Sequence, residues 1–262
     1  MNDLTILKIG GNIIDNPVLL KTVLDCFTGW NEYKILIHGG GKIANELMVK
    51  LGIEPVMNEG KRITDEKTLE IVTMVYAGWI NKNIVSKLQA GNCNAFGITG
   101  ADGNTISADK RPVKDIDYGY VGDINVQKIN TKIITNLLEN KIVPVFAPIT
   151  HDGNGQLLNT NADTIASSLA ISMAQDFKVK LIFCFEKRGV LRNNEDSDSF
   201  LSVIDENTFL KYKSQGIVHS GMIPKLENAF SAIKLGVSEI NICGPGAFSP
   251  GKFIGGTNVV LK

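Results

Sequence analysis

Short β-branched and aliphatic runs alternate along this chain with amphipathic stretches of helical spacing, and this alternation is the feature that most constrains its fold. It is typical of a mainly parallel sheet with helices on both faces. The runs are almost continuously apolar, as strands covered on both faces should be. We therefore predict an α/β fold, an open three-layer αβα sandwich with a mainly parallel central sheet. The expected strands cover residues 4–9, 33–38, 142–149, 178–185 and 239–243, and the expected helices cover residues 17–30, 42–52, 128–141, 161–175 and 222–236.

Two segments interrupt the alternation. Residues 54–64 carry an Asn-Glu-Gly turn between two short runs, which indicates a β-hairpin. Residues 99–126 are rich in turn residues and short strands, which favours an antiparallel excursion or lid. The chain has neither an internal repeat nor a low-complexity linker, so we expect a single domain over residues 1–262. Its two expected lobes share one continuous sheet and cover about residues 1–178 and about residues 179–262.

Composition excludes several classes of protein. Lys and Arg number 27, as do Asp and Glu, so the formal net charge of zero gives no electrostatic footprint for nucleic acid or an anionic membrane. No apolar stretch is long enough to span a bilayer, and the first residues reach an acid and a lysine too early for a secretory signal. The four cysteines and three histidines are scattered, which gives a zinc site little support. We expect a cytoplasmic protein that holds anions with a local cluster.

Three consecutive glycines, Gly39, Gly40 and Gly41, lie between a predicted strand and a predicted helix. Each loses more backbone entropy on folding than any other residue type, so the bare backbone needs a reason. A tight turn with positive φ requires one or two such glycines, not three. Bare N–H groups at the positive end of a helix dipole form an anion site. The triplet therefore favours a bound phosphate.

Two lysines lie at other strand–helix junctions. Lys8 lies near the end of an apolar strand and is followed by Gly10 and Gly11; it is either an edge lysine in solvent or a buried cation that meets an anion. Lys225 follows Pro224 in the first turn of a predicted helix, which is the unfavourable end of the dipole for a cation by about 0.3–1 kcal/mol. It is either an exposed lysine or a partner for phosphate.

A third junction carries Asn159, Asn161 and Asp163 at alternate positions before an apolar helix. One of them should be the helix N-cap, and a strand-like approach would let all three project into one cleft. Two lysines, a glycine triplet and one carboxylate at strand ends suit phosphoryl transfer, in which catalysis is mostly positioning and charge stabilisation. A carboxylate acceptor is already ionised, so no general base is needed.

The motifs LKIGGN, IHGGGKIANELMVKLG, GKRIT, LLNTNAD and GMIPKLENA come in the order and spacing of the amino acid kinase family, which the whole chain resembles. The resemblance is greatest to members that phosphorylate the γ-carboxylate of N-acetylglutamate with MgATP in arginine biosynthesis. It implies that Lys8 and Lys225 neutralise the moving phosphoryl group and that Asp163 holds both lysines. It implies that the N-terminal lobe binds the acylglutamate and dimerises, while the C-terminal lobe binds ATP, with Mg²⁺ held mainly by the phosphates and no metal site on the protein. It assigns Gly40, Gly41, Arg62, Asn159 and Asn161 to the substrate, and Gly10, Gly11, Glu186, Lys187, Gly189 and His219 to the nucleotide.

The chain departs from the family pattern at residues 185–190 and in the middle of its tail, residues 240–260, and a further point concerns its start. Residues 185–190 read FEKRGV where the family usually has an Asp-Val-x-Gly turn at the nucleotide pocket, although Gly189 is retained. The first strand begins by about residue 4, whereas arginine-inhibited members carry an extra N-terminal helix that links dimers into hexamers. We therefore expect a homodimer without arginine feedback.

Three alternatives remain. In the first, the substrate is N-succinylglutamate rather than N-acetylglutamate, which requires a cation near the tail of the acyl group. Lys61, Lys110 and Arg111 lie in segments that could reach this tail. The residues GGGKIA also fit a dinucleotide-binding pattern, so an NAD-binding oxidoreductase is a second enzyme hypothesis. A non-catalytic relative of the kinase fold is a third, and the retained lysines and aspartate argue against it. A Walker A loop at residues 246–253 is rejected, because Phe253 replaces the required hydroxyl and a strand follows.

Overall fold

The computed structural model describes residues 1–58, 60–193, 195–196, 199–218, 222–249 and 252–261. Within these ranges the main sheet has eight strands, and every neighbouring pair is parallel except β13–β16. The predicted mainly parallel sheet is therefore confirmed. In spatial order its strands are β12 (Val203–Asp205), β16 (Thr257–Val260), β13 (Glu239–Cys243), β11 (Phe177–Cys184), β1 (Asn2–Ile9), β2 (Tyr33–His38), β8 (Val143–Phe146) and β5 (Ala95–Ile98).

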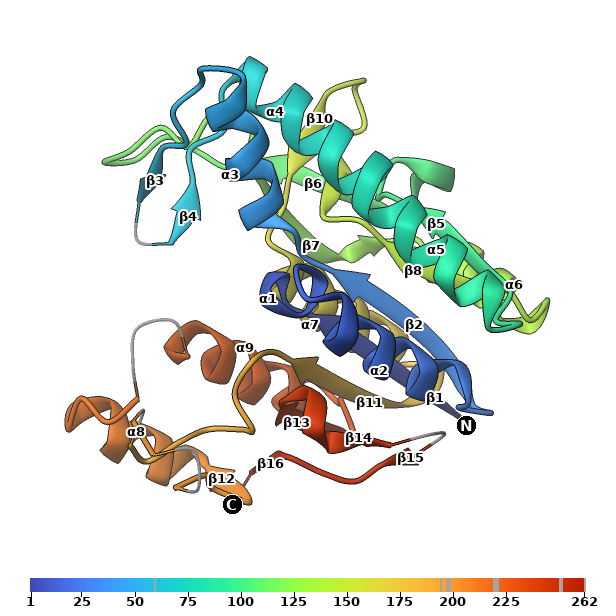
Figure 1. Ribbon diagram of the computed structural model, residues 1–262, viewed down its shortest axis with the longest axis vertical. Helices are drawn as coiled ribbons and strands as arrows, with labels where there is room; N and C mark the ends of the chain where they lie inside the picture. Colours follow the sequence, from blue (N-terminus) through green and yellow to red (C-terminus); the bar gives the residue numbers. More distant parts are fainter. Residues whose placement is uncertain (59, 194, 197–198, 219–221, 250–251, 262) are drawn as a thin grey trace.

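Helices cover both faces of the sheet, as an α/β sandwich requires (Figure 1). One face carries α1 (Gly11–Ile14), α2 (Pro17–Thr28), α3 (Gly41–Lys50), α4 (Glu66–Thr73), the π-helix η1 (Met74–Ile80) and α5 (Asn81–Ala90). The other carries α6 (Thr131–Glu139), α7 (Ala162–Met173), α8 (Glu206–Ser214) and α9 (Ile223–Lys234).

Side chains of β1 pack into two hydrophobic cores, one on each face of the sheet. Leu4 and Ile6 pack with α7 and α9, whereas Leu7 and Ile9 pack with α2 and α3. Because side chains alternate along a strand, Lys8 lies on the same face as Leu4 and Ile6. The period of the strand thus directs the Lys8 ammonium toward α7 and α9.

A second, mostly antiparallel sheet extends the structure beyond the β8 side. Its order is β10 (Leu157–Asn159), β9 (Ile149–His151), β6 (Ile106–Lys110) and β7 (Gly122–Ile129). The β6–β7 pair confirms the antiparallel excursion expected within residues 99–126. The hairpin expected within residues 54–64 is confirmed as β3 (Met57–Asn58) and β4 (Lys61–Arg62).

The tail folds back against the α2 face. After η3 (Pro245–Ala247), strands β14 (Phe248–Ser249) and β15 (Lys252–Phe253) form an antiparallel pair. The Phe248 ring stacks on Trp30 with centroids 6.3 Å apart. This hairpin, rather than a helix, confirms the rejection of a Walker A loop at residues 246–253. Among the described residues, none of the helices has the length and apolar character that crossing a membrane would require.

Candidate active site

Three parallel strands in the middle of the sheet end at the same edge, and their loops are tied together by backbone hydrogen bonds. Gly39 N donates to Ile9 O at 3.1 Å, and Gly10 N donates to Cys184 O at 2.8 Å. These bonds join the ends of β2, β1 and β11 in that spatial order. Figure 1 shows α1 and α9 toward the same side, on the left, where β1 ends. Ligands of open α/β sheets bind beyond this edge.

The structure brings Lys8, Asp163 and Lys225 together at this edge. Lys8 Nζ lies 2.7 Å from Asp163 Oδ1, and Lys225 Nζ contacts the other carboxylate oxygen, Asp163 Oδ2. Asp163 comes from the first turn of α7 and Lys225 from the first turn of α9. The exposed fractions of the three side chains are only 9%, 12% and 21% in chain order. One carboxylate therefore holds two ammonium groups in a mostly buried cluster.

This cluster carries an excess of positive charge. Burial would raise the pKa of Asp163, but Lys8 and Lys225 hold it well below its ordinary value, so the carboxylate stays ionised. Burial lowers the pKa of Lys8; Asp163 opposes this shift, and the like charge of Lys225 adds to it. The N-terminus of α7 adds a favourable dipole for Asp163. An incoming anion would relieve the repulsion between the two ammonium groups, as a phosphoryl group would.

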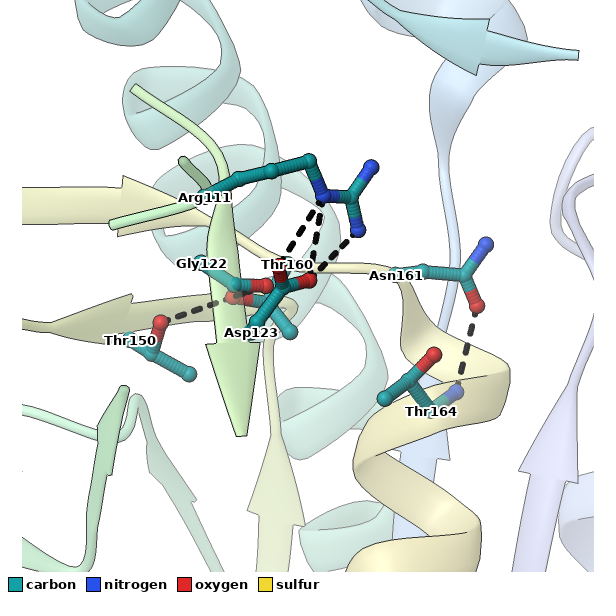
Figure 2. Close-up of polar contacts among 7 residues, drawn as sticks. All are labelled: Arg111, Gly122, Asp123, Thr150, Thr160, Asn161 and Thr164. Carbon is teal, nitrogen blue, oxygen red and sulfur yellow. Dashed lines mark hydrogen bonds and ion pairs between the residues drawn. The ribbon is translucent and has the colours of Figure 1, made fainter. Parts of the chain in front are cut away.

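The three polar residues before α7 have different partners. Asn161 is the N-cap, and its Oδ1 accepts from Asp163 N at 2.8 Å and from Thr164 N at 3.2 Å. Figure 2 shows the Asn161 amide nitrogen turned away from the helix. Asn159 Nδ2 donates to Thr64 Oγ1 at 3.0 Å. Of the three residues at alternate positions, only Asp163 contacts the lysines.

Two glycine-bearing loops meet backbone to backbone. A Cβ built on Gly39 would lie 3.5 Å from Gly11 N, and one on Gly11 would lie 4.0 Å from Gly40 N. Gly40 has φ +150° and precedes α3, and a Cβ there would lie 2.2 Å from Ile80 Cδ1. Gly40 is therefore required by its backbone conformation, and a side chain there would also displace the end of the Ile80 side chain.

His38 fixes the start of this loop, a role that the sequence did not indicate. Its ring is fully buried, and burial lowers its pKa to about 4, so it is neutral near pH 7. Nδ1 donates to Gly39 O at 2.8 Å, which leaves Nε2 to accept from Asn81 Nδ2 at 3.1 Å. In the sequence, His38 and Asn81 are two separate polar residues, and their spacing does not indicate that their side chains meet.

Arg62 lies against α3 (Gly41–Lys50). Its side chain is buried; Nη2 donates to Gly41 O at 3.1 Å and Nη1 lies 3.4 Å from Met48 Sδ. Thr64, two residues further on, receives the Asn159 amide. Arg62, Gly41 and Asn159 therefore belong to one contiguous region on the N-terminal side of the site.

The residues expected to bind nucleotide are divided. Lys187 and Gly189 line a small cavity together with Val190, Leu191, Ile217, Val218 and Met222. A Cβ on Gly189 would lie 2.5 Å from Thr257 Oγ1, so glycine is required there. Glu186 is exposed and is not among the lining residues. Gly10 and Gly11 follow β1 and are not lining residues of this cavity, and His219 lies outside the described residues.

Arg111 forms a paired site of its own beside the second sheet (Figure 2). Its Nε and Nη2 donate to Asp123 Oδ1 at 3.1 and 2.6 Å, and these hydrogen bonds raise the pKa of Arg111. Its guanidinium carbon lies 5.1 Å from the centroid of the Tyr118 ring. Nearby, Thr150 Oγ1 pairs with Thr160 Oγ1 at 2.7 Å. The arginine considered for an acyl tail thus already has a carboxylate partner.

Comparison with known proteins decides the family. The model of the amino acid kinase family matches residues 3–244. The chain belongs to this family. It is 55% identical over 244 residues to acetylglutamate kinase of Cytophaga hutchinsonii, covering 93% of this chain and 92% of that one. It is 52% identical to acetylglutamate kinase of Phocaeicola vulgatus, with 95% and 96% covered.

Solved structures of this fold agree in architecture. The protein smu.665 from Streptococcus mutans UA159 matches with a TM-score of 0.80 and 27% identity over 99% of each chain. Carbamate kinase from Giardia lamblia, at 14% identity, shares only the fold, with a TM-score of 0.70 over 100% of this chain and 99% of that chain. The predicted amino acid kinase fold is confirmed. The family match does not favour the NAD-binding alternative.

Proposed function

We infer that this chain transfers the γ-phosphoryl group of ATP to the γ-carboxylate of N-acetylglutamate, a step of arginine biosynthesis. Relatives named acetylglutamate kinase, about half identical over nearly the whole chain, support the substrate, and they do not favour the N-succinylglutamate alternative. The observation that carries the chemistry is the pair of ammonium groups joined by Asp163 at the end of the central strands.

The reaction requires these residues to stabilise charge and to position the reactants. A γ-carboxylate oxygen attacks the γ-phosphorus, the bond to the β,γ-bridging oxygen breaks, and ADP leaves. Lys8 and Lys225 stabilise the negative charge on the moving phosphoryl group, and Asp163 keeps their separation fixed before the reaction begins. Because the attacking carboxylate is already ionised, no residue has to remove a proton.

The substrate side of the site is the region around α3. Gly40 and Gly41 offer backbone N–H groups, and Arg62 supplies a planar guanidinium for the α-carboxylate. Asn159 and Asn161 lie on the approach to α7 and complete this side. We assign this function, and dimerisation, to the N-terminal lobe, about residues 1–178.

The nucleotide side comprises the loops after β1 and β11, and we assign it to the C-terminal lobe, about residues 179–262, with Gly10 and Gly11 contributed from β1. The proposal includes Glu186, Lys187, Gly189 and His219 on this side; the cavity that Lys187 and Gly189 line, at about 10 Å³, has room for about one water molecule and does not itself hold the adenosine group. The described residues contain no group of three His, Cys, Asp or Glu side chains placed to hold a metal ion. The cationic cluster fits a triphosphate that brings its own Mg²⁺, which adds positive charge between the phosphates.

A substrate comparison tests the proposal. Purified protein with MgATP is expected to release ADP with N-acetylglutamate much faster than with N-succinylglutamate or free glutamate, measured by a coupled assay. MgATP is also expected to raise the melting temperature, whereas NAD is not. Faster turnover with the succinyl substrate would replace the acetyl assignment, and no ADP release with any of the three would refute the kinase proposal.

We also propose that two copies of the chain form a homodimer. Large apolar side chains are exposed on η1 and on the edge strand β5: Met74, Trp79 and Phe96 are 57%, 67% and 53% exposed. An edge strand beside an apolar surface suits an isologous contact. The described cysteines form no disulfide, and ATP is a cytosolic substrate, so we place the dimer in the cytoplasm.

Light scattering is expected to give the mass of two chains for the wild type and of one chain for Trp79→Glu. The same charge introduced at exposed Val18 on α2, as Val18→Glu, is the control and should leave the mass unchanged. A wild-type mass of one chain would refute the dimer.

A further inference from the structure

The helix that covers the substrate side contains an irregular segment. α4 and α5 are joined without a break by η1, seven residues in π-helical conformation. π-helical turns are rare and occur frequently at functional sites. Here the inward side of η1 carries Tyr76 and Ile80, and its outward side carries exposed Met74 and Trp79.

The inward side packs on the glycine loop. A Cβ on Gly40 would lie 3.3 Å from Tyr76 Cδ1 and 2.2 Å from Ile80 Cδ1. The Tyr76 ring therefore lies directly against the backbone that we assign to substrate. Packing alone, however, does not account for a hydroxyl at this position, because a phenylalanine ring would fill the same space.

The Tyr76 hydroxyl lies in the same neighbourhood as the Arg62 guanidinium, beside Gly41. A Cβ on Gly41 would have Arg62 Nη2 at 3.7 Å and Tyr76 Oη at 3.9 Å, so both groups border the first turn of α3. Burial raises the pKa of Tyr76, with Arg62 opposing the shift, so the phenol is neutral near pH 7. Gly41 O and Met48 Sδ thus hold two sides of the guanidinium, and Tyr76 Oη lies near the first turn of α3.

We propose that Tyr76 is a positioning residue for substrate binding: its hydroxyl orients Arg62 so that the guanidinium meets the α-carboxylate of the acylglutamate. An arginine side chain loses considerable rotamer freedom when it binds, and a partner that fixes its plane beforehand reduces that loss. The inference rests on the proposed function. It adds a residue that sequence pattern alone did not single out.

Steady-state kinetics of Tyr76→Phe test this role. The variant keeps the ring that packs on Gly40 and removes only the hydroxyl. We expect the KM for N-acetylglutamate to rise about three- to tenfold, in the range of one lost polar interaction, while kcat and the KM for ATP stay within about twofold. Tyr33→Phe is the matched control, since the Tyr33 ring packs on Phe177 at the opposite end of β2 from the site.

A double-mutant cycle with Arg62→Met separates action through Arg62 from a general effect. If Tyr76 acts by orienting the guanidinium, Tyr76→Phe should change the KM for N-acetylglutamate less than twofold when Arg62 is already absent. An unchanged KM in the single variant, equal rises in both KM values, or a full effect in the Arg62→Met background would each overturn the role. The wild type and Tyr33→Phe test the proposed function separately. If neither protein turns over N-acetylglutamate, the proposed function is refuted. If both are active and Tyr76→Phe has unchanged kinetics, only the role of Tyr76 is refuted.

Discussion

Replacing Lys8 or Lys225 with methionine is expected to lower kcat by about 10²–10³-fold while the protein remains folded. Each ammonium group stabilises charge that develops on the moving phosphoryl group, and each acts in a mostly buried site where such an interaction is strong. Methionine preserves much of the side-chain volume, and Asp163 retains the other lysine as its partner. Steady-state kinetics give kcat, and circular dichroism with thermal melting checks the fold.

Lys234→Met is the matched control for this experiment. Lys234 lies on the same helix as Lys225 and also forms an ion pair, with Glu206 at 2.7 Å, but its side chain is 51% exposed. Loss of this pair should change neither kcat nor stability appreciably, since exposed ion pairs contribute about 0–1 kcal/mol. Turnover that survives in Lys8→Met or in Lys225→Met would rule out a catalytic lysine at that position.

The strands were predictable because their signal is local. Lys8 stands in an apolar run with period-2 neighbours, so its strand, and the face on which it lies, follow from residues 4–9 alone. The helix over residues 66–90 was not predicted, because Met74 and Trp79 place apolar side chains on its outward face as well. A π-helical segment also departs from the 3.6-residue period on which helix prediction depends.

The site was predictable only in part, for a similar reason. Lys8, Asp163 and Lys225 could be predicted because each is a charged residue at a predicted strand–helix junction. The carboxyl ends of parallel strands lie at one edge of the sheet, so these side chains were expected to meet. The glycine triplet was explained by ligand approach, yet the positive φ of Gly40 also requires glycine, and Ile80 packs on it from a distant helix. Contacts such as those of Arg62 with Gly41 and of His38 with Asn81 join segments whose approach no single-sequence pattern encodes.

Asp163→Asn is expected to be the most destabilising of the substitutions considered, at about 3–5 kcal/mol near pH 7. The change removes the only carboxylate that the described residues place between Lys8 and Lys225, and leaves two mostly buried ammonium groups facing each other. Urea unfolding at neutral pH measures the loss. Asp25→Asn on α2 is the control, because its ion pair with Lys21 is well exposed and should contribute less than about 1 kcal/mol.

The pH dependence of this difference identifies its electrostatic origin. The pKa of Asp163 is lower in the folded protein than its ordinary value of 3.8, so the stabilisation from its ionised form is present in full above about pH 5. As the pH falls below 3.8, the unfolded chain takes up a proton that the folded protein still refuses, and the wild type loses this contribution. Asparagine does not titrate, so the stability gap between wild type and Asp163→Asn should be constant from pH 7 to 5 and should shrink at pH 3.5. A gap that stays constant or widens at pH 3.5 would mean that Asp163 stabilises the fold by packing, and that the two lysines do not depend on its charge.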